Sequence, residues 1–148
     1  MTQTFKDTVD GADTFPGVWQ RFNEFLESHG FLDPEKMDTH IFVTCGDWDL
    51  KTMLPKQLVI SDSKLGLDQA GRAIAPYNRW INVKTPFKKQ MNLSRANVGM
   101  ASMLNKLKLE LIGRHHSGID DCHNILRIIQ KLREEGWDPS STRPSRLD

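Results

Sequence analysis

Apolar residues recur at helical spacing in three stretches of the chain, 15–26, 100–107 and 119–132. Side chains that return every three to four positions lie on one face of a helix, so each stretch predicts an amphipathic helix. Thr14 and Pro16 are suited to the N-cap and first turn of the first helix, and His29-Gly30 to its end. We expect the aromatic stripe of this helix to belong to the core.

Two short apolar runs, 39–45 and 77–83, predict β-strands. Between them, residues 55–75 are polar and show no clear period, so we predict a loop with room for one helical turn. After the second run, Thr85-Pro86 opens a short basic helix. Strands that alternate with helices predict an α/β fold.

Composition indicates one ordinary globular domain, because 148 residues with 38% apolar and 26% charged side chains can bury a sizeable core. We assign the domain to residues 1–136 and predict a disordered tail at 137–148, which is rich in Ser, Pro and Arg. No apolar run reaches membrane-spanning length and no secretory leader is evident, so we expect an intracellular protein, cytoplasmic or nuclear, without a membrane partner. Cys45 and Cys122 occupy apolar-patterned positions and predict buried thiols in a reducing compartment.

The net charge of +1 hides an asymmetry along the chain. Residues 1–62 carry five Lys and Arg against eleven Asp and Glu, whereas residues 64–114 carry ten against two. A basic segment of this kind favours binding to a polyanion, since contacts to phosphates release counterions. The alternative is a solvated face that only maintains solubility.

The stretch Gly113-Arg114-His115-His116-Ser117-Gly118-Ile119-Asp120-Asp121 leads into the third helix. Ser117 and Asp120 have the spacing of a capping box, which gives Asp120 a local structural role. Asp121 has no such role and lies at the edge of the apolar stripe, where an unpaired carboxylate is costly. With His116 five residues before it, Asp121 is typical of half a metal site beside a general base. An ordinary polar helix start is the alternative.

A second polar stretch, Thr44-Cys45-Gly46-Asp47-Trp48-Asp49, follows the first predicted strand. The carboxyl end of a strand is where α/β folds place their functional sites. Asp47 and Asp49 are both candidates there, and Asp47 also suits an N-cap or a supporting role. Trp48 suits either the core or a surface on which a base could stack.

Three segments together resemble one known family: CGDWDLKTMLP, RWINVK and GRHHSGIDDCHNI. They are similar to the DEDDh family of 3′→5′ exonucleases, in the branch of the histone-mRNA and small-RNA-trimming exonucleases and the prion-protein-interacting exonuclease. The resemblance runs from about Val9 to Gly136, apart from residues 61–74. It implies a ribonuclease-H-like α/β fold with a helix-rich remainder. It also implies hydrolysis of phosphodiester bonds in RNA processing.

The same resemblance assigns roles to particular residues. Asp49, followed by LKTML, and Asp121 correspond to metal ligands for two Mg²⁺ ions, with Mn²⁺ as an alternative, and His116 corresponds to the general base. The implied partner is single-stranded RNA or a 3′ overhang, with DNA as a further candidate, because no motif reports recognition of the 2′-hydroxyl. We predict that seven residues contact the nucleic acid: Trp48, Lys51, Lys84, Lys88, Lys89, Arg114 and Ser117.

The sequence departs from the family at its first motif, an Asp-x-Glu on a central strand that two further strands follow. Asp7, Asp10 and Asp13 lie outside any apolar run and do not replace it. We therefore expect a fold without the first three strands and a site with half its carboxylates. One interpretation is part of an exonuclease. A second is a catalytically incomplete nucleic-acid-binding or interaction module, and a third is a zinc site made from His115, His116, Cys122 and His123.

Overall fold

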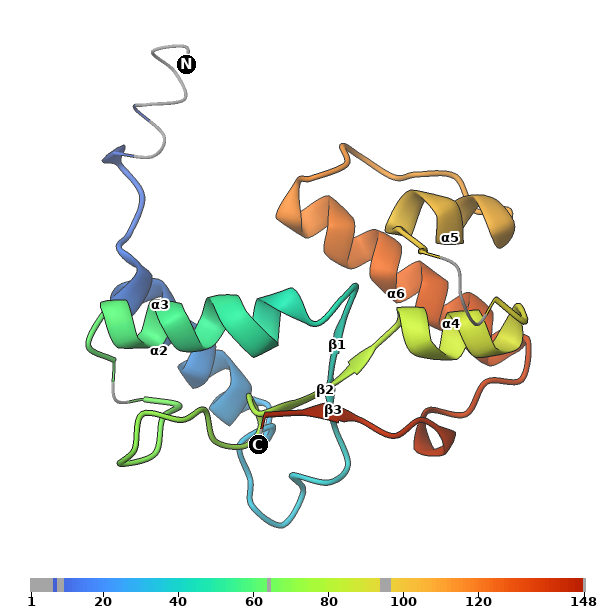
Figure 1. The fold of residues 1–148 in the computed structure, drawn as a ribbon. Coiled ribbons are helices and arrows are strands. Elements are labelled where there is room, and N and C mark those ends of the chain that lie inside the picture. The colour runs from blue at the N-terminus through green and yellow to red at the C-terminus, as the bar shows by residue number, and fades with distance from the viewer. Residues whose placement is uncertain (1–6, 8–9, 64, 94–96, 148) are drawn as a thin grey trace.

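The computed structural model describes residue 7 and residues 10–63, 65–93 and 97–147, and its helices and strands are labelled in Figure 1. In chain order they are α2 (Phe15–Ser28), β1 (Phe42–Thr44), the π-helical turn η1 (Asp49–Met53), α3 (Leu54–Ile60), β2 (Arg79–Asn82), α4 (Lys84–Gln90), α5 (Met100–Lys106), α6 (Gly118–Glu134), the 3₁₀ turn η2 (Pro139–Ser141) and β3 (Ser145–Arg146). None of the helices in this described part is long and apolar enough to cross a bilayer.

The strands form one sheet in the order β1-β2-β3. β1 and β2 are parallel, with Phe42 opposite Trp80 and Thr44 opposite Asn82. β3 runs antiparallel to β2, and Ser145 lies opposite Trp80. Because β1 and β2 are parallel, their carboxyl ends meet at the same edge of the sheet, where the chain continues into η1 and into α4.

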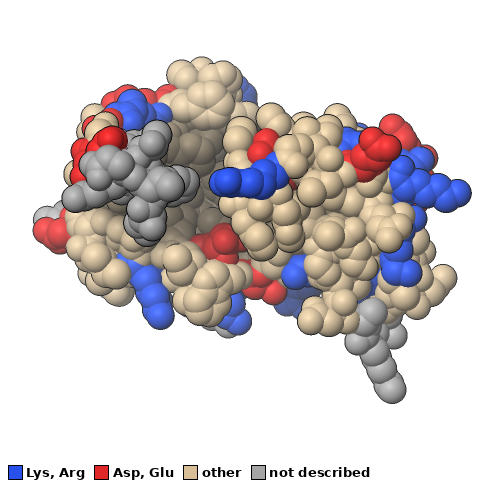
Figure 2. All heavy atoms as spheres, turned by 90° about the horizontal axis from the view of Figure 1, so that it is seen from above, with Lys and Arg blue, Asp and Glu red and all other residues tan. Residues whose placement is uncertain are grey.

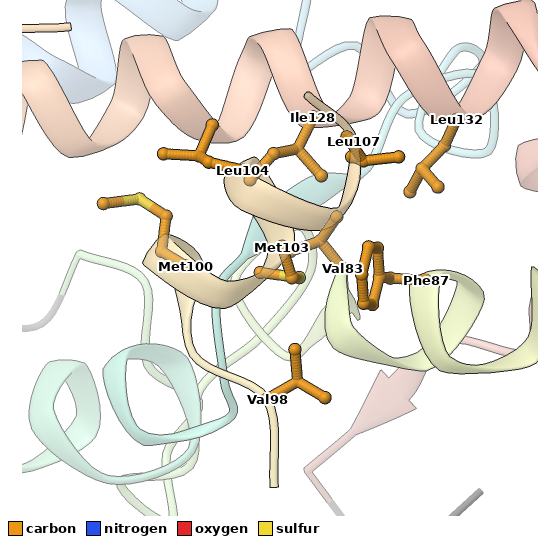
Figure 3. Close-up of a cluster of buried hydrophobic side chains, with 9 residues drawn as sticks. All are labelled: Val83, Phe87, Val98, Met100, Met103, Leu104, Leu107, Ile128 and Leu132. Atoms are coloured by element: carbon orange, nitrogen blue, oxygen red, sulfur yellow. The ribbon is translucent and has the colours of Figure 1, made fainter. Parts of the chain in front are cut away.

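Helices lie on both sides of the strands, α2 and α3 on one side and α4, α5 and α6 on the other (Figure 1). Each group has its own core. Val83, Phe87, Met103, Ile128 and Leu132 are fully enclosed where α4, α5 and α6 meet the end of β2 (Figure 3).

The second core joins α2 and α3 to the segment before β2. Trp19, Leu26, Leu58 and Tyr77 are its main members, and Trp19 Nε1 donates a hydrogen bond of 2.9 Å to the carbonyl of Leu65. Beside this core, an apolar cavity of about 440 Å³ lies against β1 and is lined by aromatic side chains that include Phe22. The aromatic stripe of α2 is therefore only partly enclosed, with Trp19 buried and Phe22 36% exposed.

Most predicted elements are present, and two expectations were wrong. Residues 54–60 form helix α3, which is longer than the one helical turn expected in this loop, since Leu58 is completely buried in the cluster that contains Trp19 and this tertiary contact outweighs the weak periodicity of the segment. The strand predicted for 39–45 covers only Phe42–Thr44, and all three of its residues are half-buried rather than buried.

The C-terminal segment also differs from the disordered tail that its composition predicts. Asp138 caps η2 by accepting the amide of Ser140 at 2.9 Å, and Trp137 Nε1 donates to Thr142 Oγ1 at 2.9 Å. The segment then pairs with β2 as strand β3. Backbone pairing with an existing strand needs no hydrophobic periodicity in the added segment, which is why the pattern does not reveal it. The domain boundary at residue 136 stays a prediction.

We predict that Leu132→Ala lowers the free energy of unfolding by about 2–5 kcal/mol, because it leaves a cavity at a completely buried position among α4, α5 and α6. Leu126→Ala is the matched control on the same helix, at a side chain that is 51% exposed, and should change it by no more than about 0.5 kcal/mol. Urea unfolding followed by circular dichroism measures both. Equal effects would contradict the assigned core.

Candidate active site at the carboxyl ends of the parallel strands

Asp49 and Lys84 reach the same edge of the sheet from two different strands. β1 turns through Gly46, whose φ of +133° favours glycine, and η1 then begins at Asp49 with an exposed side chain. β2 leads directly into α4, whose first residue is Lys84. A Cβ on Gly46 would lie 3.8 Å from Lys84 Nζ, so the lysine side chain extends over the turn that follows β1.

Asp47 lies in the same turn, and its carboxylate faces the sheet. Oδ1 accepts hydrogen bonds from Trp80 Nε1 at 2.9 Å and from Ser145 Oγ at 3.2 Å, while Oδ2 accepts from Asn82 Nδ2 at 3.1 Å. Burial raises the pKa of Asp47, but these three bonds together with nearby Lys51 outweigh it and leave the pKa below its usual value. Asp47 is thus the aspartate of this turn with structural partners, and Asp49 is the one that faces solvent.

The start of α6 carries the second group of candidate residues. Asp121 Oδ1 accepts the backbone N–H of His116 at 3.3 Å, and Asp120 Oδ2 accepts the backbone N–H of Arg114 at 3.0 Å. His116 has a φ of +68°, a left-handed conformation that is unusual for a residue other than glycine. Non-glycine residues in this region occur preferentially at functional sites, where surrounding contacts hold them.

Two expectations for this stretch need correction. Ser117 is the N-cap, as the spacing predicts, but its side chain caps no backbone amide, and Asp120 bonds the amide of Arg114 instead of closing a capping box. Asp121 has a local bond as well, to His116, so a structural role is not confined to Asp120. Gly113 explains the shift, because a Cβ there would lie 2.3 Å from Asp120 Cγ and the chain must pass this carboxylate closely.

The Cys45 thiol is affected by charged side chains from both groups. Burial raises the pKa of Cys45, Lys84 opposes the shift, and the carboxylates of Asp49 and Asp121 add to it. Charge interactions weaken with distance and with solvent screening, so all three side chains lie within electrostatic range of this thiol. These charge interactions support the prediction that Asp49 and Asp121 face each other. The distance between their two carboxylates is the quantity that tests this prediction.

Asp49 and Asp121 have the hard carboxylate oxygens that Mg²⁺ and Mn²⁺ prefer. Within the described part of the chain, however, no group of three or more His, Cys, Asp or Glu side chains could hold a metal ion. The residues present therefore fit part of a divalent-metal site. Cys122, one of the residues considered for a zinc site, was expected to have a buried thiol. That expectation was wrong, because the thiol is exposed. The thiol of Cys45, also expected to be buried, is only half-buried.

The residues predicted to contact nucleic acid differ in their exposure. Trp48 is 63% exposed, so of its two predicted roles the stacking surface fits and the core does not. Lys51 is exposed beside Asp49, and Lys84 is half-buried next to Gly46. Arg114 is exposed and Ser117 half-buried at the start of α6, whereas Lys88 and Lys89 lie in the last turn of α4.

Figure 2 shows a hollow between the two halves of the molecule, with Asp or Glu atoms on its floor and Lys or Arg atoms at its rim.

Asn124 is a supporting residue that the sequence reasoning missed. Its completely buried amide donates to the carbonyl of Ile112 at 2.8 Å and accepts the N–H of Ile112 at 3.0 Å. It also donates to the carbonyl of Asp120 at 2.8 Å. Asn124 thereby fastens the segment before the His116 loop to the first turns of α6. The sequence could have indicated this role, because Asn124 places an amide side chain in an otherwise apolar helical stripe, one turn before Ile128.

Comparison with known proteins agrees with this architecture. The Exonuclease family model (RNase_T) matches residues 1–129. ERI1 exoribonuclease 3 of Homo sapiens is 40% identical over 137 residues, which cover 93% of this chain and 37% of that protein. The 3'-5' exoribonuclease 1 of Mus musculus is 31% identical over 136 residues, covering 92% and 36%. The chain thus spans little more than a third of the length of these relatives.

Solved structures give the same result. The nuclease domain of 3'hExo, a DEDDh family member solved with bound rAMP, superposes with a TM-score of 0.77 at 27% identity and covers 95% of this chain and 64% of that one. Cell-death related nuclease 4 superposes with a TM-score of 0.71 at 28% identity, covering 86% and 41%. These likenesses define the class as a ribonuclease-H-like nuclease domain and confirm the predicted fold. The chain belongs to the Exonuclease family, in its DEDDh group, whose members generally use divalent metal ions.

We predict that Asp120 contributes mainly to stability and Asp121 mainly to function. The backbone bond from Arg114, then the side chain of Ser117, hold the pKa of Asp120 below its usual value in the folded protein. A depressed pKa stabilises the fold above the unfolded value of about 4, and this stabilisation disappears as pH falls through the folded value. Asp120→Asn should therefore lower the melting temperature at pH 7 and flatten its decline between about pH 5 and pH 3.

Asp121→Asn is the matched control, because asparagine keeps an acceptor oxygen for the His116 amide and removes one negative charge. It should leave the melting temperature at pH 7 unchanged or higher. Thermal unfolding followed by circular dichroism at each pH makes the comparison. If Asp121→Asn were the less stable variant, the structural roles of the two aspartates would be reversed.

Proposed function

We propose that this chain carries the chemistry of a 3′→5′ exoribonuclease, which removes nucleotides from the 3′ end of single-stranded RNA or of a 3′ overhang. The observation that carries the proposal is that the charges of Asp49, Asp121 and Lys84 all act on the Cys45 thiol, while Asp121 accepts a hydrogen bond from the backbone N–H of His116. Two relatives named as exoribonucleases and a structural relative solved with rAMP support RNA as the substrate class. DNA is a second polymer to test.

In this proposal Asp49 and Asp121 bind divalent metal through their carboxylate oxygens, with two Mg²⁺ ions in a complete site and Mn²⁺ as a substitute. The chemistry that such ions supply is activation of a water molecule and stabilisation of the leaving 3′ oxygen. His116 accepts the proton of the attacking water at an unprotonated ring nitrogen. Its ring stacks on His115 with centroids 4.0 Å apart, and both side chains are exposed and reachable by substrate.

The remaining residues of the proposed site bind and orient the nucleic acid. Trp48 offers its exposed face to a base, since stacking on an aromatic ring tolerates any base. Lys51, Lys84 and Arg114 face phosphates near the site, and Ser117 offers a hydroxyl beside them. Lys88 and Lys89 extend the basic surface along α4, farther from the reacting bond.

A second candidate function is nucleic-acid binding without turnover. It is favoured by one observation, that the described residues include no group of three or more His, Cys, Asp or Glu side chains that could hold a metal ion. A Mg²⁺ ion held by two carboxylates keeps most of its water and occupies its site poorly. The two candidates agree on binding and differ on cleavage, so each is tested separately.

We predict that the 148-residue chain binds single-stranded RNA weakly and that the affinity falls steeply with salt. Lys88→Gln/Lys89→Gln should reduce the slope of log K against log salt by about 1.4, or roughly 0.7 per lost phosphate contact. Lys131→Gln is the control, because this lysine pairs with Glu134 and Glu135 at the far end of α6. Fluorescence anisotropy with a labelled oligonucleotide measures each slope, and an unchanged slope in the double variant would remove α4 from the interface.

We predict slow or no trimming of RNA by this chain alone in Mg²⁺ or Mn²⁺, because its described carboxylates fill only part of a two-metal site. Any trimming should stop in both His116→Ala and Asp121→Asn, and His115→Ala is the control for the neighbouring stacked ring. Gel analysis of a 5′-labelled oligonucleotide resolves the shortened products. Rapid metal-dependent trimming that requires His116 would show that further acidic residues of this chain complete the site.

A further inference from the structure

Asp47 connects three segments that surround the site. Its carboxylate accepts hydrogen bonds from Trp80 and Asn82 on β2 and from Ser145 on β3. Its backbone carbonyl accepts the N–H of Lys51 at 2.8 Å, which closes the first turn of the helix that begins at Asp49. One residue therefore fastens the turn after β1 to the sheet and to the start of η1.

Asn82 extends this network to the other side of the site. Its Nδ2 donates to Asp47 Oδ2 at 3.1 Å, and its Oδ1 accepts the backbone N–H of Lys84 at 3.2 Å. An ionised carboxylate is only an acceptor, so it must face the NH₂ end of the amide. The charge on Asp47 thus determines the orientation of Asn82, and that orientation presents an acceptor to Lys84.

We propose that Asp47 is a positioning residue. It fixes the position of Asp49 relative to Lys84 through the hydrogen bonds that it accepts from Trp80, Asn82 and Ser145. The inference rests on the proposed function for what Asp49 and Lys84 do, although the network itself does not depend on it. Hydrogen bonds to an ionised acceptor are stronger than neutral ones, and three of them restrict the turn more than a packing contact would. Ser145 brings the C-terminal segment into the same network, so β3 supports the site through this carboxylate.

The test reverses the polarity of the hydrogen bond between residues 47 and 82, and a second substitution then restores an acceptor for the Lys84 amide. Asp47→Asn keeps the shape of the side chain but turns an NH₂ group toward Asn82, which must rotate and present its own NH₂ group to the Lys84 amide. In the double variant Asp47→Asn/Asn82→Asp, the carboxylate introduced on β2 accepts from the side-chain amide introduced in the turn and from the Lys84 backbone amide together, and the net charge equals that of the wild type. Asp68→Asn is the matched control, because this carboxylate accepts the amides of Ala70 and Arg72 in a loop outside the site.

The first readout is amide hydrogen exchange of Lys51 and Lys84 by NMR, which requires neither metal nor RNA. In Asp47→Asn both amides should exchange faster by on the order of tenfold, the change expected from losing one or two hydrogen bonds of ordinary strength. The double variant should return to the wild-type rates, and Asp68→Asn should not depart from them. Ser145→Ala removes a single donor and should shift the rates in the same direction by less, which keeps the test available if Asp47→Asn does not fold.

The second readout is Mn²⁺ affinity, measured from the EPR signal of the free ion. Asp47→Asn should weaken binding by on the order of tenfold, the scale for partners that orient metal ligands, and the double variant should recover it. A purely structural role would lower the melting temperature without this change. If Asp49→Asn bound Mn²⁺ as well as the wild type, the metal site of the proposed function would fail, and the exchange rates would still decide the role of Asp47. Equal exchange in Asp47→Asn and Asp68→Asn, or no recovery in the double variant, would overturn the inference.

Discussion

The parallel pairing of β1 with β2 is the constraint on which the site depends. Parallel strands end at the same edge, and here that edge receives the turn with Asp49 from one strand and the start of α4 with Lys84 from the other. β1 has only three half-buried residues, so its own packing does little to define where it ends. The Asp47 carboxylate fixes the turn that follows β1, because its three hydrogen-bond donors lie on β2 and β3.

The start of α6 meets a different constraint, because two adjacent aspartates share one helix turn. Asp120 faces the segment before the helix and accepts an amide there, which requires Gly113 to lack a side chain. Asp121 faces the His116 loop, whose backbone N–H it accepts, and its charge helps to raise the pKa of Cys45. Asn124 then fixes the preceding segment to the helix from inside the core. The left-handed His116 donates its backbone N–H to Asp121, so the loop and the first turn of α6 are joined at this residue.

The two cores explain why this arrangement can persist around a hollow. The enclosed core of α4, α5 and α6 supports Lys84 and Asp121, while the core of α2 and α3 supports the turn with Asp49. The core of α2 and α3 contains a buried polar pair, in which Tyr77 donates its hydroxyl to Asn23, and burial raises the pKa of Tyr77 to about 12. The phenol therefore stays neutral, which suits a side chain that must donate a hydrogen bond inside an aromatic cluster.

Local pattern by itself determined the elements whose stability comes from one continuous apolar face. The helices α2, α5 and α6 and the strand β2 could be predicted for this reason, and so could the α/β class. The three motifs were enough to identify the family, and the resemblance to that family selected Asp49 over Asp47 and assigned roles to His116 and Asp121.

Only the tertiary structure decided the features that depend on contacts distant in sequence. Helix α3 is stabilised by burial of Leu58 in a remote cluster, and β3 by backbone pairing with β2, and neither leaves a periodic signal. The partners of Asp47 lie 33, 35 and 98 residues away, so its carboxylate could not be distinguished from that of Asp49 by spacing. The exposure of Cys122 was likewise set by which face of α6 meets α4 and α5, because a pattern defines a stripe on a helix but not how much of that stripe its neighbours cover.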